Sequence, residues 1–129
     1  LYDQTFVEQT YHAAYDPLRG VRTKCFKCVR SFEERPFWFA PNVDGGLSKE
    51  VARQLGYFNK PRPFEMLFDL RKDPMERENL ATDPSYDDVL QRMRSILEGW
   101  MRETDDPMLR GNIPPSPGAR VTPPDSYAP

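Results

Sequence analysis

The sequence lacks an excess of charge of either sign and lacks any long apolar run. Lysine and arginine number 18 against 20 acidic residues in a chain of 129, so the net charge is −2. This balance favours neither nucleic acid nor an anionic membrane as a partner. No apolar stretch approaches the roughly 20 residues of a membrane-spanning helix, and no signal peptide is evident. The opening residues Leu1-Tyr2-Asp3 are typical of the middle of a longer protein.

Histidine and cysteine are also scarce, and this limits the chemistry of the chain. His12 is the only histidine, so histidines of this chain cannot complete a Ser-His-Asp triad or a histidine metal site. Cys25 and Cys28 have the spacing of redox and zinc motifs. However, residues i and i+3 of a strand point to opposite faces, and zinc needs four ligands. We therefore interpret both cysteines as strand residues and expect no metal site and no catalytic residue in this chain.

The clearest structural signals begin at Phe64. From Phe64 to Leu70, apolar residues at even positions alternate with acids at Glu65 and Asp69. This period of two predicts a strand whose even-numbered side chains are buried and whose acids face water. Asp73-Pro74 then predicts a turn.

A long amphipathic helix is predicted after this turn. Asp83 is placed to cap it, and Pro84 takes the first helical position, where a missing N–H costs nothing. A helix over 84–103 is about 30 Å long and can cross a small sheet. Its apolar residues form one stripe at the 3.6-residue period: Val89, Leu90, Met93, Ile96, Leu97, Trp100 and Met101.

The chain before this unit predicts further strands. Gln4 to Tyr11 alternates as a strand does and leads to His12. Tyr15-Asp16-Pro17 is a turn signal. Residues 21–29 are rich in β-branched and aromatic side chains and predict one or two strands, with a bend near Thr23-Lys24.

The middle of the chain predicts a long loop and a short helix. Residues 33–46 contain two prolines and two glycines around Phe37-Trp38-Phe39, which indicates a loop held by aromatic side chains. These aromatics either stack on a sugar or are buried in the core or against another domain. Residues 48–55 predict a helix capped by Ser48, with Val51, Ala52 and Leu55 on one face and Gly56 at its end.

The last part of the chain is rich in proline. Seven of the 14 prolines fall between Asp105 and Pro129, which favours extended chain that either lies along the surface or is disordered. We therefore expect one α+β domain over 1–108 and a proline-rich tail over 109–129.

Taken together, these motifs resemble the C-terminal subdomain of the sulfatase family in the alkaline-phosphatase-like superfamily. Residues 65–70 match the family's strand, Asp73 to Leu80 matches its Asp-Pro-x-Glu-x-x-Asn-Leu segment, and the helix ending Trp100 to Thr104 follows. Thr10-Tyr11-His12 and the segment 15–23 match the region before the family's basic strand. The nearest branch is that of heparan N-sulfatase (N-sulfoglucosamine sulfohydrolase). The resemblance covers about 5–32 and 64–108, and departs from the family at Cys25 and Cys28.

The resemblance implies the architecture of this subdomain and a separate catalytic domain that it packs against. The subdomain is implied to be a small antiparallel sheet of about four strands packed against one long C-terminal amphipathic helix. Family members place this subdomain against a large α/β catalytic domain, so that its first strands and loops line one side of the substrate cleft. Their nucleophile is a formylglycine made in a Cys/Ser-x-Pro-x-Arg motif beside a bound calcium ion. Neither Cys25 nor Cys28 begins that motif. The resemblance therefore implies that formylglycine and calcium belong to an N-terminal catalytic domain, and that this segment alone is inactive.

The candidate substrate-binding residues follow from chemistry and from the resemblance together. They are His12 and Arg19, supported by Tyr11, Tyr15 and Arg22. Histidine can hydrogen-bond a sugar hydroxyl or a sulfate group, and the planar fork of arginine matches an oxyanion. The alternative is that Arg19 and Arg22 pair with acids of the domain itself.

Two functions remain open on the sequence. The first is a sulfatase segment that binds its own N-terminal catalytic domain and a sulfated carbohydrate such as heparan sulfate. The resemblance implies a periplasmic, secreted or lysosomal location for it. The second is a stand-alone binding module that uses its aromatic loop and proline-rich tail to hold a protein partner.

Overall fold

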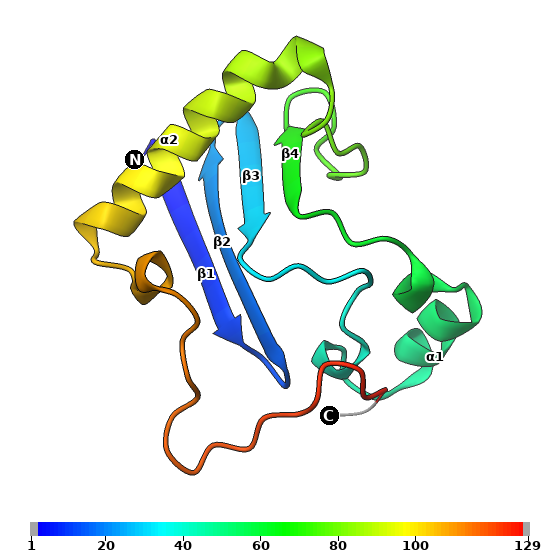
Figure 1. Ribbon diagram of the computed structural model, residues 1–129. Coiled ribbons are helices and arrows are strands. Elements are labelled where there is room, and N and C mark those ends of the chain that lie inside the picture. Colours follow the sequence, from blue (N-terminus) through cyan, green and yellow to red (C-terminus); the bar gives the residue numbers. More distant parts are fainter. Residues whose placement is uncertain (1–2, 128–129) are drawn as a thin grey trace.

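The computed structural model describes residues 3–127. Four antiparallel strands form one sheet in the order β1-β2-β3-β4. They are β1 (Gln4–Tyr11), β2 (Tyr15–Thr23), β3 (Phe26–Ser31) and β4 (Glu65–Asp69). Helix α2 (Asp87–Glu103) crosses one face of the sheet, and the smaller helix α1 (Leu47–Gln54) lies to one side (Figure 1). The expected α+β class, with about four strands and one long helix, is confirmed.

The core lies between α2 and the sheet. The buried residues of α2 are Leu90, Met93, Leu97 and Met101, all from the predicted stripe. They pack against Val21, Cys28 and Leu67. Asp83 accepts a hydrogen bond from the Ser85 N–H at the start of the 3-10 turn Pro84–Tyr86 that leads into α2. The predicted stripe and the capping role of Asp83 are therefore confirmed, but the α-helix begins at Asp87 and not at Pro84, which opens the 3-10 turn.

The predicted turn at Tyr15-Asp16-Pro17 is wrong, because β2 already begins at Tyr15. The chain reverses earlier, and Tyr11 pairs with Tyr15 across the hairpin. The register shifts between Gln9 and Tyr11, so β2 carries one extra residue there. Proline is tolerated at such a bulge because it needs no ladder N–H. Pro17 therefore lies inside a strand without interrupting the sheet.

The predicted strand is confirmed as β4, and Phe68 is buried as predicted, but the rest of the predicted burial pattern is wrong. Leu67 is fully buried and pairs with Cys28 on the α2 side, whereas Phe64 is 45% exposed. The two acids share the buried face: Glu65 binds Arg94 of α2, and Asp69 is 1% exposed and binds Arg71. A buried carboxylate is tolerated when an arginine pairs with it. The acids of this strand therefore do not mark its solvent-facing side, as the alternation had suggested.

Between β3 and β4 the chain leaves the sheet and forms a small unit. It contains the 3-10 turns Ala40–Asn42 and Tyr57–Asn59 with α1 between them. Helix α1 is capped by Gly46, without a side-chain bond, so the predicted Ser48 cap is wrong. Its apolar face is not covered, since Val51 and Leu55 are exposed and the buried residue of α1 is Lys49.

The proline-rich segment lies along the molecule and is not an extension of α2. It begins with the 3-10 turn Pro107–Arg110, whose Met108 enters the core. Further along, the Thr122 N–H donates to the Ala13 carbonyl, and Asp125 binds Arg35. Figure 1 shows this segment passing beneath the β1–β2 hairpin toward α1. Among the described residues, no helix is long and apolar enough to cross a bilayer.

Candidate functional site

The β1–β2 hairpin carries His12 at its tip and is held in place by Asn42. The Asn42 side-chain oxygen accepts hydrogen bonds from the Ala13 and Ala14 N–H groups, at 3.1 and 2.9 Å. Its amide nitrogen donates to Asp16. A loop residue thus fixes the turn that presents His12, so the hairpin and the unit around α1 are positioned together.

Tyr11 and Tyr15 join this hairpin to the proline-rich segment. The Tyr11 hydroxyl donates to the Ile113 carbonyl at 2.7 Å, and the Ile113 N–H donates to the Tyr15 hydroxyl at 3.3 Å. Their rings lie 5.0 Å apart. Burial, with smaller effects of Tyr15 and Glu33, raises the pKa of Tyr11, so its hydroxyl stays a neutral donor. Both tyrosines therefore have structural partners within the chain.

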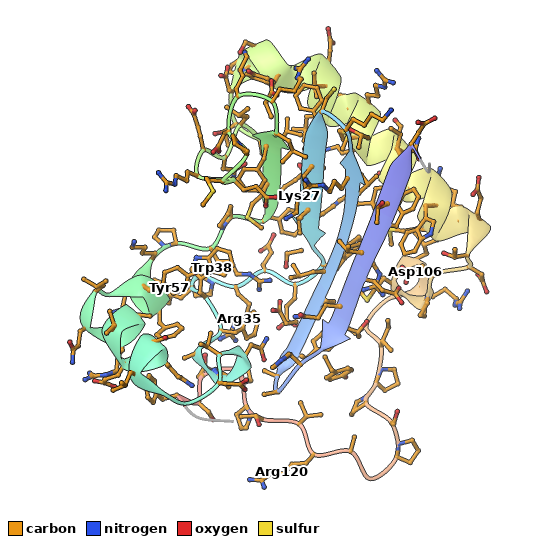
Figure 2. The ribbon with its side chains drawn as sticks, turned by 180° about the vertical axis from the view of Figure 1, so that it is seen from behind. Lys27, Arg35, Trp38, Tyr57, Asp106 and Arg120 are labelled. Atoms are coloured by element: carbon orange, nitrogen blue, oxygen red, sulfur yellow. The ribbon has the colours of Figure 1, made fainter. Side chains whose placement is uncertain are left out.

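A shallow pocket of about 190 Å³ lies where the hairpin meets that segment. His12, Tyr11, Ser116 and Arg120 contribute to its wall. Imidazole, hydroxyl and guanidinium groups together can hydrogen-bond sugar hydroxyls and an oxyanion. Arg120, labelled in Figure 2, extends outward from the segment. Arg120 was not predicted from the sequence, because a proline-rich segment carries no signal that shows which part of the fold it will contact.

Arg19 lies in the interior and is only 2% exposed. Its Nε and one terminal nitrogen donate to Asp106, at 2.5 and 3.1 Å. The remaining N–H groups donate to the Gln9 and Leu18 carbonyls and to the Thr10 hydroxyl. All five guanidinium donors are thus used within the chain. Arg19 therefore pairs with an acid of the domain itself, which was the alternative to substrate contact.

Arg22 is half-exposed and stands far along β2 from the hairpin tip. It pairs with Glu76 at 3.4 Å, and Lys27 binds the same carboxylate at 2.5 Å. Its partners across the sheet are Thr5 and Lys27, toward the start of β1. The structure therefore brings His12, Tyr11 and Tyr15 together, and leaves Arg19 and Arg22 outside that group.

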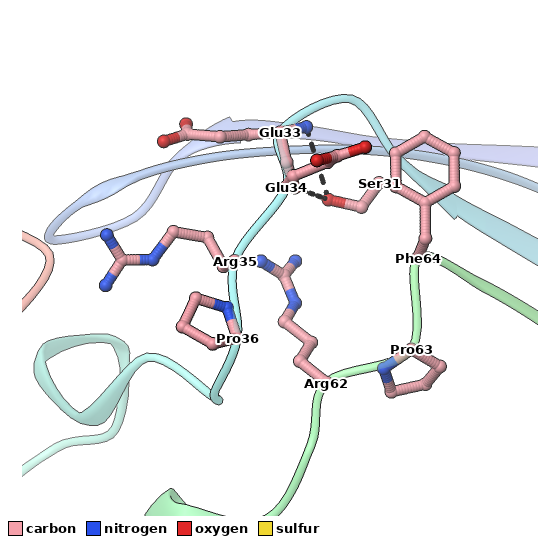
Figure 3. A pocket seen from close by; sticks show the side chains of 8 residues that line it. All are labelled: Ser31, Glu33, Glu34, Arg35, Pro36, Arg62, Pro63 and Phe64. Atoms are coloured by element: carbon pink, nitrogen blue, oxygen red, sulfur yellow. Dashed lines mark hydrogen bonds between the residues drawn. The ribbon is translucent and has the colours of Figure 1, made fainter.

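A second and larger pocket, of about 410 Å³, opens between the segment after β3 and the segment before β4 (Figure 3). Its wall includes Glu33, Arg35, Arg62 and Phe64. The Arg62 guanidinium is nearly buried and binds the Asp16 carboxylate. Asp16 also accepts hydrogen bonds from Asn42 and Gln9. One carboxylate thus connects this pocket to the hairpin that carries His12.

Aromatic rings surround the two arginines of that pocket. Arg62 lies 4.7 Å from the ring centre of Phe39 and 5.9 Å from that of Trp38, and Arg35 lies 4.9 Å from Phe39. Trp38 in turn stacks on Tyr57 at 5.9 Å (Figure 2). The aromatic loop is therefore packed within the unit around α1, and the Trp38 ring contacts guanidinium and tyrosine.

Two apolar surfaces lie outside the core. On α1 and its C-cap, Leu47, Val51 and Leu55 recur at every fourth residue and are 87%, 52% and 73% exposed. On the sheet, the face turned away from α2 carries Val7, which is 50% exposed. Gly20, its partner across the sheet, leaves no room for a side chain, since an added Cβ would lie 3.0 Å from Val7. Single exposed apolar residues are common, but a helical stripe of three indicates a contact surface.

The two cysteines lie outside the hairpin pocket and the 410 Å³ pocket. Cys28 is fully buried, and burial raises the pKa of its thiol to about 12. Cys25 lies in the turn between β2 and β3, so its prediction as a strand residue is wrong, whereas Cys28 lies in β3 as predicted; both cysteines are free. The part of the chain that the structure describes holds no group of three or more His, Cys, Asp or Glu side chains that could bind a metal ion.

Comparison with known proteins gives relatives of one kind. No family model matches the chain. It is 30% identical over 122 residues to an ulvan-active sulfatase of Formosa agariphila, covering 82% of this chain and 20% of that protein. It is 29% identical over 125 residues to human N-sulphoglucosamine sulphohydrolase, covering 84% of this chain and 25% of that protein.

Solved structures show the same fold. A crystal structure assigned to a sulfatase from Bacteroides thetaiotaomicron superposes with a TM-score of 0.59, at 22% identity, over 98% of this chain and 23% of that one. A 2-O GAG sulfatase superposes with a TM-score of 0.57, at 22% identity, over 98% of this chain and 22% of that one. The chain thus spans about a fifth to a quarter of each of these proteins.

Proposed function

The chain is homologous to sulfatases and corresponds to their C-terminal subdomain, and from this premise we propose that it completes the substrate cleft of a sulfatase. The reaction is hydrolysis of a sulfate ester or a sulfamate on a sugar. One observation carries the proposal: sulfatase relatives match more than four-fifths of the chain. The polar pocket at the hairpin supports it, because its side chains suit a sulfated carbohydrate.

The nucleophile of this reaction belongs to the catalytic α/β domain. Sulfate hydrolysis needs an activated nucleophile and cations around the charged oxygens of the sulfate group that is transferred. Neither cysteine of this chain begins a Cys/Ser-x-Pro-x-Arg motif, and the Cys28 thiol is buried. We therefore assign formylglycine and calcium to that domain, and substrate contact to His12 and the groups beside it.

Docking on the catalytic domain accounts for the exposed stripe of α1. Leu47, Val51 and Leu55 have no covering partner among the described residues. An apolar helical stripe of this kind packs well into a groove of another helix or sheet layer. The catalytic domain of the same polypeptide is the partner we propose, because the chain spans only about a fifth of its sulfatase relatives.

The substrate we propose is a sulfated glycan, with heparan sulfate as the first candidate. One relative is named for N-sulphoglucosamine and another for ulvan, at nearly the same identity. Release of sulfate from a panel tests this directly: N-sulfoglucosamine, a heparan disaccharide, an ulvan oligosaccharide and a small aryl sulfate. The native-length polypeptide should release sulfate from at least one sulfated sugar, and release from none of them would contradict the proposal.

His12 is the residue in this chain to test first. In the native-length polypeptide, His12→Ala should raise KM for the sulfated sugar about tenfold, the loss expected for one hydrogen bond to a charged group. Its melting temperature should stay unchanged, because His12 lies at an exposed hairpin tip. An unchanged KM would remove His12 from the cleft without touching the sulfatase assignment.

A further inference from the structure

The tip of the β1–β2 hairpin, residues 12–14, is held from two sides by segments that are distant in the sequence (Figure 1). On one side, the Asn42 side-chain oxygen accepts from the Ala13 and Ala14 N–H groups, which lie 29 and 28 residues away in sequence. On the other side, the Ala13 carbonyl accepts a 2.9 Å hydrogen bond from the Thr122 N–H of the proline-rich segment. The conformation of the tip is therefore fixed from outside the hairpin as well as by its own turn.

The orientation of the Asn42 amide is itself fixed. Ala14 is fully buried, and a buried N–H group almost always has a partner, which the Asn42 oxygen supplies. The Asn42 nitrogen donates to the Asp16 carboxylate at 3.1 Å. Because a carboxylate only accepts hydrogen bonds, the nitrogen has to face it, and the oxygen is left for the tip. Arg62 and Gln9 also donate to Asp16 and hold the carboxylate in place.

His12 is the side chain that this arrangement presents. It is exposed and lines the 190 Å³ pocket at the hairpin. The next residue, Ala13, is bonded at both its N–H and its carbonyl, so the backbone beside the imidazole is immobilised. A side chain that contacts a ligand loses less conformational entropy on binding when its backbone is already ordered.

The unit around α1 carries Asn42 and also the exposed stripe proposed to dock on the catalytic domain. Lys49 of α1 is 3% exposed and donates to the carbonyl of Val43, the residue after Asn42. A side chain from the buried side of the helix is thus bonded to the turn that holds the hairpin tip. Docking of α1 would therefore place the tip, and with it His12, relative to the catalytic domain.

We propose that Asn42 and the Thr122 N–H are positioning groups for His12 in substrate binding. They hold the tip in one conformation, so that the imidazole meets the sulfated sugar without a prior ordering step. The inference rests on the proposed function. A loose tip would have to be ordered at each binding event, which raises KM and leaves kcat nearly unchanged.

A double-mutant cycle in the native-length polypeptide tests the role of Asn42, with sulfate release from the sulfated sugar as the readout. Asn42→Ala should raise KM about fivefold without changing kcat, because it acts on binding alone. Combined with His12→Ala, it should raise KM only about tenfold, the effect of His12→Ala by itself, whereas independent effects would multiply to about fiftyfold. A multiplied effect in the double variant, or an unchanged KM for Asn42→Ala, would overturn the proposal.

Asn79→Ala is the matched control for this cycle. Like Asn42, Asn79 makes three hydrogen bonds through its side-chain amide, but it lies beside β4, at the opposite edge of the sheet from β1. Loss of stability alone lowers the fraction of folded enzyme, which reduces kcat and leaves KM unchanged. Asn79→Ala should therefore not raise KM, and a rise equal to that of Asn42→Ala would overturn the proposal.

Thr122 allows a test that changes one hydrogen bond. Thr122→Pro removes the N–H donor in a segment that already continues with Pro123 and Pro124, whereas Thr122→Ala keeps it. Thr122→Pro should raise KM about threefold, the effect of one hydrogen bond, and Thr122→Ala should leave it unchanged. Equal KM values for the two variants would overturn the role of the Thr122 N–H.

Hydrogen–deuterium exchange of the native-length polypeptide separates failure of this inference from failure of the proposed function. If the unaltered protein releases no sulfate, the proposed function fails, and if His12→Ala leaves KM unchanged, the assignment of His12 fails. In either case Asn42→Ala should still speed exchange of the Ala13 and Ala14 amides about tenfold, while Asn79→Ala leaves them nearly unchanged. Equal exchange in Asn42→Ala and the unaltered protein would show that Asn42 does not hold the tip and would overturn the inference.

Discussion

Arg19 of β2 and Asp106, just after α2, form a buried ion pair across 87 residues of sequence. Both side chains are 2% exposed, and Asp106 also accepts a hydrogen bond from the Met108 N–H. The pair fastens the end of the long helix to the sheet at the point where the proline-rich segment begins. It also orders that segment, which goes on to contact the hairpin and α1.

Removing Asp106 should destabilise the chain strongly. Asp106→Ala leaves the buried Arg19 charge with only the exposed Glu8 carboxylate, 3.7 Å away, and breaking a buried pair in this way costs about 3–5 kcal/mol. Urea unfolding measures the loss. The neighbouring Asp105→Asn is the control, because the side chain of Asp105 is 81% exposed and its loss should stay within about 0.5 kcal/mol. Equal effects of the two variants would contradict a buried pair.

The same ion pair should make the unfolding free energy depend on pH in the acidic range. Burial alone would raise the pKa of Asp106, but hydrogen bonds from Arg19 and the Met108 N–H outweigh it and hold the pKa below its usual range. The stabilisation is therefore complete above the unfolded value of about 3.9 and is lost as the pH falls through the lower folded value. Unfolding free energies between pH 7 and pH 2 measure it. Asp106→Asn should show a smaller decrease over the same range.

Gly20 should not tolerate a side chain. A Cβ there would lie 3.0 Å from the Cys28 carbonyl oxygen and 3.2 Å from Val29. Gly20→Ala should therefore cost about 1–3 kcal/mol through overpacking. Gly99 in α2 has open space around it, and Gly99→Ala should stabilise the helix by about 0.5–1 kcal/mol. Thermal unfolding of both variants tests this, and shifts of the same sign would contradict it.

Asn79 should contribute as much to the unfolding free energy as a buried core residue does. Its oxygen accepts from the Leu67 and Ala81 N–H groups, and its amide donates to the Glu65 carbonyl. Asn79→Ala removes the side-chain partner of two groups of β4 and of the Ala81 N–H, at a cost of about 2 kcal/mol. Asn59→Ala, at an exposed turn, is the control and should change the unfolding free energy little.

The exposed apolar residues of the α1 stripe should affect the melting temperature only in the native-length polypeptide, where the catalytic domain can cover them. If Leu55 packs against the catalytic domain there, Leu55→Glu removes about 1.5–3 kcal/mol of apolar burial and adds a charge to the interface. The melting temperature should fall. Gln54→Glu, one residue away on the exposed side of α1, should leave it unchanged. Identical melting temperatures for the two variants would place the docking surface elsewhere.

Much of the fold could be predicted because periodicity and capping are local. The stripe of α2, its Asp83 cap and strand β1 depend on neighbouring residues, and all were predicted. The face of β4 was not, because Glu65 and Asp69 are neutralised by Arg94 and Arg71, and no period reveals such partners. Likewise, Pro17 indicates a turn locally but lies at a bulge in β2.

The candidate site was harder to predict, because its residues meet through the tertiary fold. His12, Tyr11 and Tyr15 share a hairpin, and sequence proximity grouped them correctly. Arg120, Arg62 and Glu33 reach their pockets only through the path of the proline-rich segment and of the chain around α1. Arg19 looked available as an anion-binding residue, and its partner Asp106 is 87 residues away.

The central claim is that this chain is the C-terminal part of a sulfatase, and its most direct test is a peptide map with intact mass of the polypeptide as its source makes it. The account predicts several hundred further residues before Leu1, among them a Cys/Ser-x-Pro-x-Arg peptide that carries formylglycine. A native polypeptide that begins at or near Leu1, without such a peptide, would contradict the account and leave a non-catalytic binding module.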